Sequence, residues 1–120
     1  MVGTGRNGGG QVPIPMKRFE VWLVRLDPTR GAEMSKTRPA VIVSPDVMND
    51  RLHTLIVAPL TAGGFRAPFR IVCQFGGVSG QVALDHLRAL DKTRLLRQLG
   101  TLDQQSVKAI LQALAEMLAA

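Results

Sequence analysis

Short apolar runs separated by proline and glycine follow one another between residues 19 and 84. Residues 40–44 lie between Pro39 and Pro45, and residues 54–58 are closed by Pro59. Runs of this length, rich in β-branched residues, are too short for stable helices and are typical of strands buried on both faces. We therefore expect a mainly β fold with appended helices, built on a small, strongly bent sheet or partly open barrel.

The same patterns predict the other elements. Further strands are expected over residues 19–26, 69–73 and 80–84. Alternation in the second of these turns Arg70 outward. Residues 31–38 are polar and charged and predict an exposed loop, whereas 46–51 predict a turn or a short helix. Residues 92–99 predict a short helix that ends at Gly100.

The last segment has the periodicity of an amphipathic helix. Thr101 and Gln104 have the spacing of a capping box, with Asp103 in the first turn, so the helix is expected to begin there. The polar face is thin, which favours packing on the barrel and leaves packing against a partner subunit open. The apolar positions recur at i, i+3, i+4 and i+7: Val107, Ile110, Leu111, Leu114, Met117 and Leu118.

Length and composition predict one domain. Residues 1–15 are rich in glycine and proline and predict a flexible leader, and residues 16–120 form the predicted domain. No apolar stretch is long enough to span a membrane, and no signal peptide is recognisable. A single cysteine without an export signal fits the cytoplasm.

The charge balance favours an anionic partner. The chain has 15 Lys and Arg against 9 Asp and Glu, a formal net charge of +6. A contribution to solubility alone is the alternative explanation. Aromatic residues make up only 4%, which argues against a platform that stacks several bases. We assign Trp22 to the core rather than to base stacking.

Metal, cofactor and nucleophile motifs are missing from the sequence. His53 and His86 are far apart, and no spacing typical of a metal site, a phosphate-binding glycine loop or a nucleophile elbow occurs. Cys73 lies in an apolar run, where a buried inert thiol is expected. We therefore predict no metal and no cofactor.

Polar residues instead gather at strand ends. If the strands pair in one sheet, an Arg and a Thr at neighbouring ends can hold a phosphate, with a guanidinium fork and a hydroxyl donor. Fixed cationic donors lower the barrier to phosphodiester cleavage. In RNA the 2′-hydroxyl supplies the nucleophile. The polar residues concerned are Glu33, Lys36, Arg38, Thr61, Asp85, His86 and Arg88.

Four blocks of the sequence resemble one known family. They are LDPTRGAE at residues 26–33, TRPAVIVSP at 37–45, VAPLT at 57–61 and DHLRALDK at 85–92. In this order they resemble the MazF/PemK (Kid) family of toxin endoribonucleases. The first two blocks are specific, and the resemblance covers residues 18–120.

The resemblance implies fold, activity and partners. It implies an SH3-like, partly open barrel with a C-terminal helix, acting as a homodimer without contact to a membrane. It implies metal-independent cleavage of single-stranded RNA at short specific sequences, which leaves a 2′,3′-cyclic phosphate and a 5′-hydroxyl. It also implies a cognate antitoxin whose acidic tail occupies the RNA groove.

The resemblance also assigns roles to single residues. Arg38 and Thr61 match the family's catalytic pair, and Glu33 and Asp85 match acidic positions tied to activity in some members. Because a guanidinium stays protonated, Arg38 is expected to stabilise the transition state or at most donate a proton. Glu33 or Asp85 would accept the proton of the 2′-hydroxyl, although a paired arginine would lower the pKa of Asp85 and weaken it as a base. Further residues expected along the RNA path are Arg30, Lys36, Arg66, His86 and Arg88.

The chain departs from the family at Phe19, Met34, Ala62 and His86. Phe19 stands where the family commonly has glycine, and we expect that change to affect only packing. The other three departures bear on base recognition, so we do not carry over a cleavage sequence from the family to this chain. His86 is expected to contact a base or lie on the surface rather than act in catalysis. The alternative function is a non-catalytic or gyrase-inhibitor-like toxin of the same fold that binds a protein partner.

Overall fold

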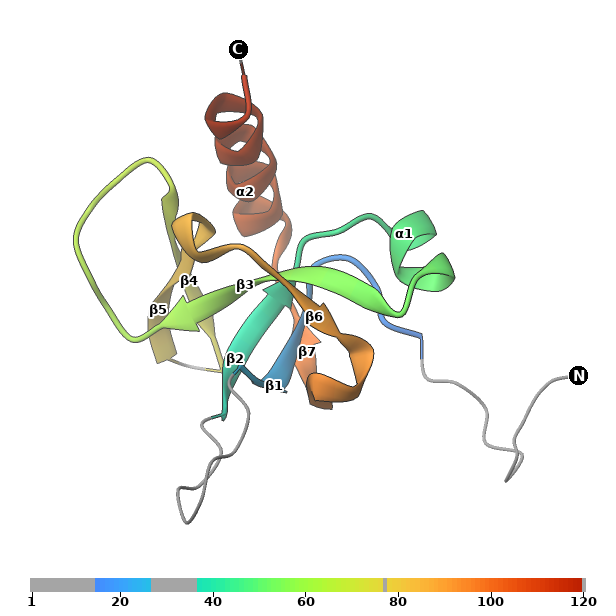
Figure 1. Cartoon of the computed structure of the whole chain (residues 1–120). Helices are drawn as coiled ribbons and strands as arrows, with labels where there is room; N and C mark the ends of the chain where they lie inside the picture. The colour runs from blue at the N-terminus through green and yellow to red at the C-terminus, as the bar shows by residue number, and fades with distance from the viewer. Residues whose placement is uncertain (1–14, 27–36, 77, 120) are drawn as a thin grey trace, which may run out of the picture.

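The computed structural model describes residues 15–26, 37–76 and 78–119, and within them one curled sheet carries the fold (Figure 1). The leader predicted over residues 1–15 lies outside these ranges except for Pro15. The strands are β1 Glu20–Arg25, β2 Thr37–Ile42, β3 Thr54–Thr61, β4 Arg70–Phe75, β5 Val78–Ala83, β6 Arg88–Asp91 and β7 Leu95–Thr101. The helices are α1 Asp46–Arg51 and α2 Gln104–Met117, with single 3-10 turns η1 Leu84–His86 and η2 Lys92–Arg94.

Strand β3 is the centre of this sheet. The strand order is β4-β5-β3-β2-β1-β7, and β6 pairs with β3 off this path. On one side β3 pairs with β2. On the other side it pairs first with β6, over Thr54–Val57, and then with β5 at Leu60 and Thr61. This change of partner bends the sheet into the curled, partly open barrel that the sequence predicts.

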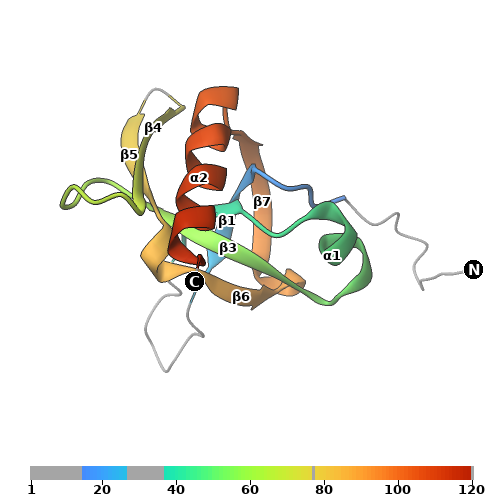
Figure 2. The same cartoon turned by 90° about the horizontal axis from the view of Figure 1, so that it is seen from above.

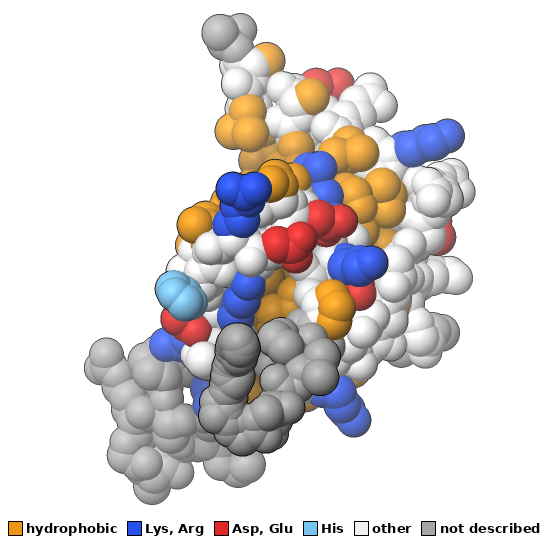
Figure 3. All heavy atoms as spheres, turned by 90° about the vertical axis from the view of Figure 1, so that its right-hand side faces the viewer, with side chains coloured by type: hydrophobic (Ala, Val, Ile, Leu, Met, Phe, Trp, Pro, Cys, Tyr) orange, Lys and Arg blue, Asp and Glu red, His pale blue; other side chains and the backbone are white. Residues whose placement is uncertain are grey.

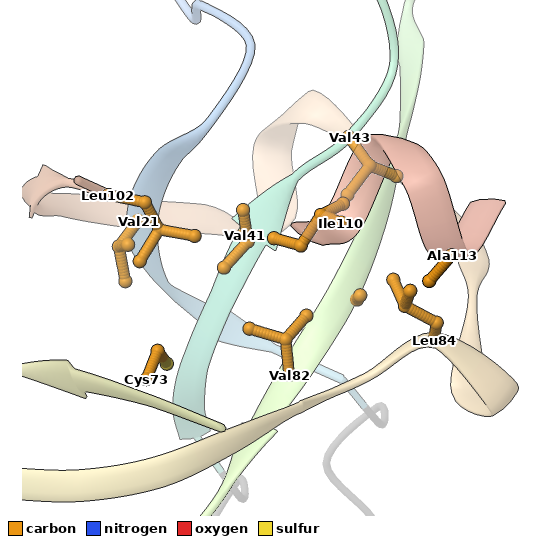
Figure 4. Close-up of a cluster of buried hydrophobic side chains, with 10 residues drawn as sticks. Val21, Val41, Val43, Cys73, Val82, Leu84, Leu102, Ile110 and Ala113 are labelled. Carbon is orange, nitrogen blue, oxygen red and sulfur yellow. The ribbon is translucent and has the colours of Figure 1, made fainter. Parts of the chain in front are cut away.

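Helix α2 covers one face of the sheet, as Figure 2 shows from above. Its Ile110 and Ala113 are buried against apolar side chains from β1, β2, β4 and β5. Figure 4 shows Ile110 directed toward Val41 and Val43. Burial of these side chains stabilises the packing of the helix on the sheet, because apolar surface is removed from water. We call this face the helix face.

The opposite face of the sheet carries a second apolar cluster. Trp22 and Val24 of β1 pack there with Ile42, Leu55 and further side chains of β2, β3, β6 and β7. Trp22 is a core residue, as predicted, with its indole N–H donating to Glu20 Oε1 at 3.0 Å. We call this side the outer face. Beyond the cluster it continues over the ends of β2 and β3 and onto β5 and β4, where the candidate site lies.

Both strands that carry the predicted catalytic pair are longer than expected toward the site. The loop predicted up to Arg38 is wrong at its end, because β2 begins at Thr37, which pairs with Arg25 of β1. Strand β3 does not stop at Pro59. The β6 ladder has ended at Val57 and the β5 ladder begins at Leu60, so the missing N–H of Pro59 interrupts no ladder on that side.

The helix predicted over residues 92–99 is also wrong. Only η2 is helical, and Leu95–Thr101 form β7, which pairs with β1 and covers an otherwise open sheet edge. Gly100 does not cap a helix. A Cβ there would lie 2.9 Å from the Phe75 ring, so the glycine permits close packing of β7 on that ring. Tertiary pairing here overrides local helix preference.

Two local expectations need smaller corrections. Helix α2 begins at Gln104 with Asp103 as its N-cap, whose carboxylate accepts from Ser106 N, and Thr101 belongs to β7. Phe19 has a φ of 69°, a conformation that favours glycine. The replacement of the family's glycine by Phe19 therefore affects the backbone as well as packing.

Candidate functional site

A row of side chains crosses three strands on the outer face. Thr61 of β3 lies opposite Gln81 of β5, and Gln81 lies opposite Val72 of β4. Directly opposite residues of an antiparallel pair point to the same face. The adjacent Leu60 and Val82 point to the helix face, so the row of Thr61 points away from α2.

The register of β2 and β3 brings Arg38 to the same row. The ladder between these strands ends at the pair Ala40 and Pro59. If this register is extended by two residues, it places Arg38 opposite Thr61, and opposite residues have Cβ atoms about 5 Å apart. Arg38 is exposed, and within the described ranges its guanidinium has no hydrogen-bond or ion-pair partner. The expected approach of Arg38 and Thr61 is consistent with this register and stays a prediction.

Thr61 is followed by the segment that connects β3 to β4, residues 62–69, which we call the connecting loop. Thr61 Oγ1 donates to the carbonyl of Gly63 at 2.8 Å. The loop borders a groove of about 260 Å³, whose other side is formed by the β4–β5 hairpin. Arg66 is exposed and lines the groove, as do Gly63, Val72 and Gln81. Ala62, which follows Thr61 in the sequence, is another of the residues that line this groove.

Arg70 and Asp85 form a bidentate ion pair beside the groove. Arg70 Nε lies 2.6 Å from Asp85 Oδ1, and Arg70 Nη2 lies 2.9 Å from Asp85 Oδ2. The hydrogen bonds from Arg70 hold the pKa of Asp85 below its ordinary value, and the same contact raises the pKa of Arg70. A carboxylate with a lowered pKa is a weaker proton acceptor. The ion pair with Arg70 therefore makes Asp85 a weak base, as expected for a carboxylate paired with an arginine.

The connecting loop is packed onto this ion pair. The ring of Phe65 lies over the Arg70 guanidinium, 4.5 Å from centroid to Cζ, and meets the Phe69 ring edge to face. A Cβ on Gly64 would lie 2.9 Å from Arg70 Nη1 and 2.9 Å from Gln81 Oε1. Gln81 Nε2 donates to the Phe65 carbonyl at 3.3 Å. Gln81 Oε1 is buried and has no hydrogen-bond partner among the described residues.

The remaining predicted site residues fall into three groups. His86 is exposed, with Nε2 3.4 Å from Asp85 Oδ2, so it lies at the edge of this cluster. Arg88 lies on β6 opposite Val57, four residues from Thr61, which is about 13 Å along the strand. The others lie outside the described residues: Arg30, Glu33 and Lys36.

Sequence reasoning missed Arg70, Gln81 and Phe65. The alternation of β4 predicted that Arg70 points away from the helix face, as it does, but its side chain is covered by Phe65 instead of being exposed. Its partner could not be found in this way, because Asp85 follows β5 and meets Arg70 only through the register of the β4–β5 hairpin, in which Arg70 lies opposite Ala83. Gln81 carried no signal beyond its place in a strand.

Outside this cluster, the distribution of basic side chains and the burial of Cys73 give little support for a second site. On the face shown in Figure 3, which is the right-hand side of Figure 1, the Lys and Arg side chains are scattered among acidic and apolar ones instead of being gathered in one patch. Cys73 is buried, and burial raises the pKa of its thiol, as expected for an inert cysteine. No helix in the part of the chain that the structure describes is long and apolar enough to cross a membrane.

Comparison with known proteins gives consistent matches over most of the chain. Residues 17–118 match the family described as PemK-like, MazF-like toxin of type II toxin-antitoxin system. The chain is 35% identical over 109 residues to the endoribonuclease PemK of Escherichia coli, covering 86% of this chain and 82% of that protein. It is 32% identical to the endoribonuclease MazF9 of Mycobacterium tuberculosis, covering 82% of this chain and 92% of that protein.

Solved structures agree on the fold. The crystal structure of MazF from Deinococcus radiodurans superposes with a TM-score of 0.74 at 25% identity, covering 90% of this chain and all of that one. A MazE–MazF crystal structure from the same organism gives a TM-score of 0.75 at 26% identity, covering 88% and 97%. The predicted mainly β barrel with a C-terminal helix is confirmed, and the expectation of an endoribonuclease is confirmed at the level of the family. The chain belongs to the PemK-like, MazF-like toxins of type II toxin–antitoxin systems.

Proposed function

We propose that this chain is a toxin endoribonuclease that cleaves single-stranded RNA, including mRNA, at short specific sequences. Cleavage in this proposal needs no metal and proceeds by attack of the ribose 2′-hydroxyl on the adjacent phosphate. The consequence is inhibition of translation and growth. The observation that carries the proposal is the position of Arg38 and Thr61 on neighbouring strand ends, on one face and next to a groove.

Arg38 and Thr61 act on the phosphate in this mechanism. The guanidinium offers two parallel N–H donors to the phosphoryl oxygens, and the Thr61 hydroxyl offers a third. As O2′ attacks, a bond to phosphorus forms, the bond from phosphorus to O5′ breaks, and negative charge grows on the oxygens that are not bridging. Donors fixed in advance stabilise that charge. Arg38 is suited to this role because it is exposed and unpaired within the described ranges.

Two protons must move during the reaction. The 2′-hydroxyl loses one, and the departing O5′ gains one, so the products are a 2′,3′-cyclic phosphate and a 5′-hydroxyl. Glu33 and Asp85 are the candidate acceptors from the sequence. The Arg70 ion pair disfavours Asp85, because it lowers the pKa of that carboxyl. Glu33 is therefore the preferred acceptor in this proposal.

The proposal includes partners and a compartment. We expect a cognate acidic antitoxin, in keeping with the MazE–MazF complex among the structural relatives. We also expect a homodimer, for which the exposed apolar side chains of Leu111 and Met117 on α2, with Leu118 at its C-cap, offer a contact surface. The substrate places the activity in the cytoplasm. Arg66, His86 and Arg88, with Arg30 and Lys36, are the proposed RNA contacts.

The decisive experiment is incubation of the purified protein with a long single-stranded RNA in excess EDTA, followed by sequencing of the new 5′ ends. The proposal predicts cuts within one short sequence motif. Cleavage that requires magnesium would contradict the metal-independent mechanism. Binding of a protein such as gyrase without any RNA product would instead support the non-catalytic alternative.

A further inference from the structure

We propose that Asp85 is a positioning residue that acts through Arg70 and the connecting loop to hold the Thr61 hydroxyl in place. The inference rests on the proposed RNA cleavage and assigns Asp85 a different role from proton acceptor. It depends on an unbroken series of contacts from the carboxylate to the hydroxyl. The first contact joins residues 15 apart in the sequence, and the later ones lie within the connecting loop and its neighbouring strands.

The series begins with the immobilisation of Arg70. Both oxygens of Asp85 accept from its guanidinium, through Nε and Nη2. The Arg70 side chain is only 8% exposed, so this pair is shielded from water better than an ordinary surface ion pair. A bidentate pair fixes the plane of the guanidinium as well as its position.

The second step is the packing of the connecting loop on that plane. The Phe65 ring lies over the guanidinium at 4.5 Å, an attractive arrangement because the ring face carries partial negative charge. Gly64 lies so close to Arg70 Nη1 that no Cβ would fit between them. Gln81 holds the Phe65 carbonyl from the neighbouring strand. The middle of the loop is thus held by Arg70 and Gln81.

The third step connects the loop to Thr61. The Gly63 carbonyl, next to Gly64, accepts the Thr61 hydroxyl at 2.8 Å. That contact selects the side-chain rotamer and sets the position of Oγ1 before RNA arrives. Rotation about the Cβ–Oγ1 bond then turns the hydroxyl hydrogen to a phosphate oxygen. If Arg70 were free to move, Gly64 and Gly63 would lose their support and Thr61 would sample other rotamers.

If Asp85 were a proton acceptor, its substitution would affect the cleavage rate differently from the substitution of a positioning residue. A proton acceptor acts on the substrate, so its loss and the loss of the Thr61 hydroxyl should multiply. A positioning residue acts only through that hydroxyl, so its loss should have no further effect once the hydroxyl is gone. The two roles also differ for asparagine at position 85, which cannot take up the proton but retains one oxygen that accepts from Arg70.

The test is a double-mutant cycle of Thr61→Val and Asp85→Ala, measured as single-turnover cleavage of a single-stranded RNA. We expect Asp85→Ala to slow cleavage about threefold to tenfold in the parent protein and less than about twofold in the Thr61→Val background. Asp85→Asn should retain more activity than Asp85→Ala. Equal losses in both backgrounds, with asparagine as poor as alanine, would overturn the inference. Asp50→Ala, an exposed carboxylate on α1, is the matched control.

A second measurement does not depend on RNA cleavage. Arg66 is exposed in the connecting loop and offers trypsin a cut before Ala67, whereas Arg51 at the end of α1 offers a reference site. We expect Asp85→Ala and Arg70→Gln to accelerate the cut at Arg66 relative to the cut at Arg51, and Asp50→Ala to leave that ratio unchanged. An unchanged ratio in Asp85→Ala would overturn the inference. If this ratio rises while the parent protein cleaves no RNA, the proposed function fails and the loop-holding role of Asp85 stands.

Discussion

Arg38 and Arg70 lie on the same face of the sheet, on either side of Thr61, and differ in how each guanidinium is held. Arg38 is exposed near the start of β2, and its guanidinium has no hydrogen-bond or ion-pair partner among the described residues. Arg70, at the start of β4, is largely buried, paired with Asp85 through two hydrogen bonds and covered by Phe65. The difference teaches that a free guanidinium suits a substrate phosphate, whereas a paired one suits the support of a loop.

The largest expected effect is at Arg38. Arg38→Ala should slow RNA cleavage at least about 100-fold, the scale of removing one donor to a developing oxyanion. Because the side chain is exposed and unpaired within the described ranges, the thermal unfolding midpoint should stay within about one degree of the parent. Single-turnover kinetics and a melting curve measure the two effects. A large loss of thermal stability together with little loss of cleavage would reverse the roles that we give to the two arginines.

Thr61 should show an intermediate effect. Thr61→Val keeps the shape of the side chain but removes the hydroxyl, and should slow cleavage about tenfold. Thr61→Ser keeps the hydroxyl and should retain more of the rate. The same kinetic assay applies. Valine and serine variants of equal activity would show that the hydroxyl has no part in the reaction.

The connecting loop allows a comparison of two adjacent glycines. Gly64→Ala should lower activity, because the new Cβ would collide with Arg70 Nη1 and Gln81 Oε1 at a φ of 147°. The loss should be smaller than that of Thr61→Val, since the Thr61 hydroxyl is still present. Gly63→Ala is the matched control, since a Cβ there meets nothing within 4 Å. Relative cleavage rates of the two variants test the point. Equal losses would mean that packing on Arg70 does not matter to the site.

The smallest expected effect is a pH dependence of stability. Because the folded pKa of Asp85 lies below its unfolded value, the ion pair adds stability above about pH 4, and this contribution is lost as the pH falls through the folded pKa. The melting temperature of the parent should therefore exceed that of Arg70→Gln at pH 7, and the gap should narrow below about pH 4. A gap that stays constant down to about pH 2 would contradict the lowered pKa.

The two arginines also show how far the sequence could predict the site. Arg38 and Thr61 could be proposed from the sequence, because each lies next to a strand signal within a block that resembles the family. Arg70 was predicted to point outward, but its partner depends on the pairing of β4 with β5. Nothing local to residues 69–73 indicates Asp85.

In the fold, too, elements set by local sequence were predictable, whereas elements set by tertiary pairing were not. The buried strands around Val41 and Val57 were predictable, since short β-branched runs bounded by proline favour strands buried on both faces. The segment that forms β7 was predicted as a helix, because its leucines and arginines favour one. The open edge of β1 gives that segment a better partner, and only the completed sheet contains that information. The positive φ of Phe19 is likewise a consequence of tertiary structure.

The most direct test of the account uses an RNA oligonucleotide that contains one cleavage site and a single 2′-deoxy substitution at the nucleotide whose 2′-hydroxyl would attack. In excess EDTA, the all-RNA version should be cut to a 2′,3′-cyclic phosphate and a 5′-hydroxyl, and the substituted version should bind but remain intact. Cleavage of the substituted oligonucleotide at the normal rate would contradict attack by the 2′-hydroxyl and, with it, the role of Arg38 and Thr61 in stabilising that step.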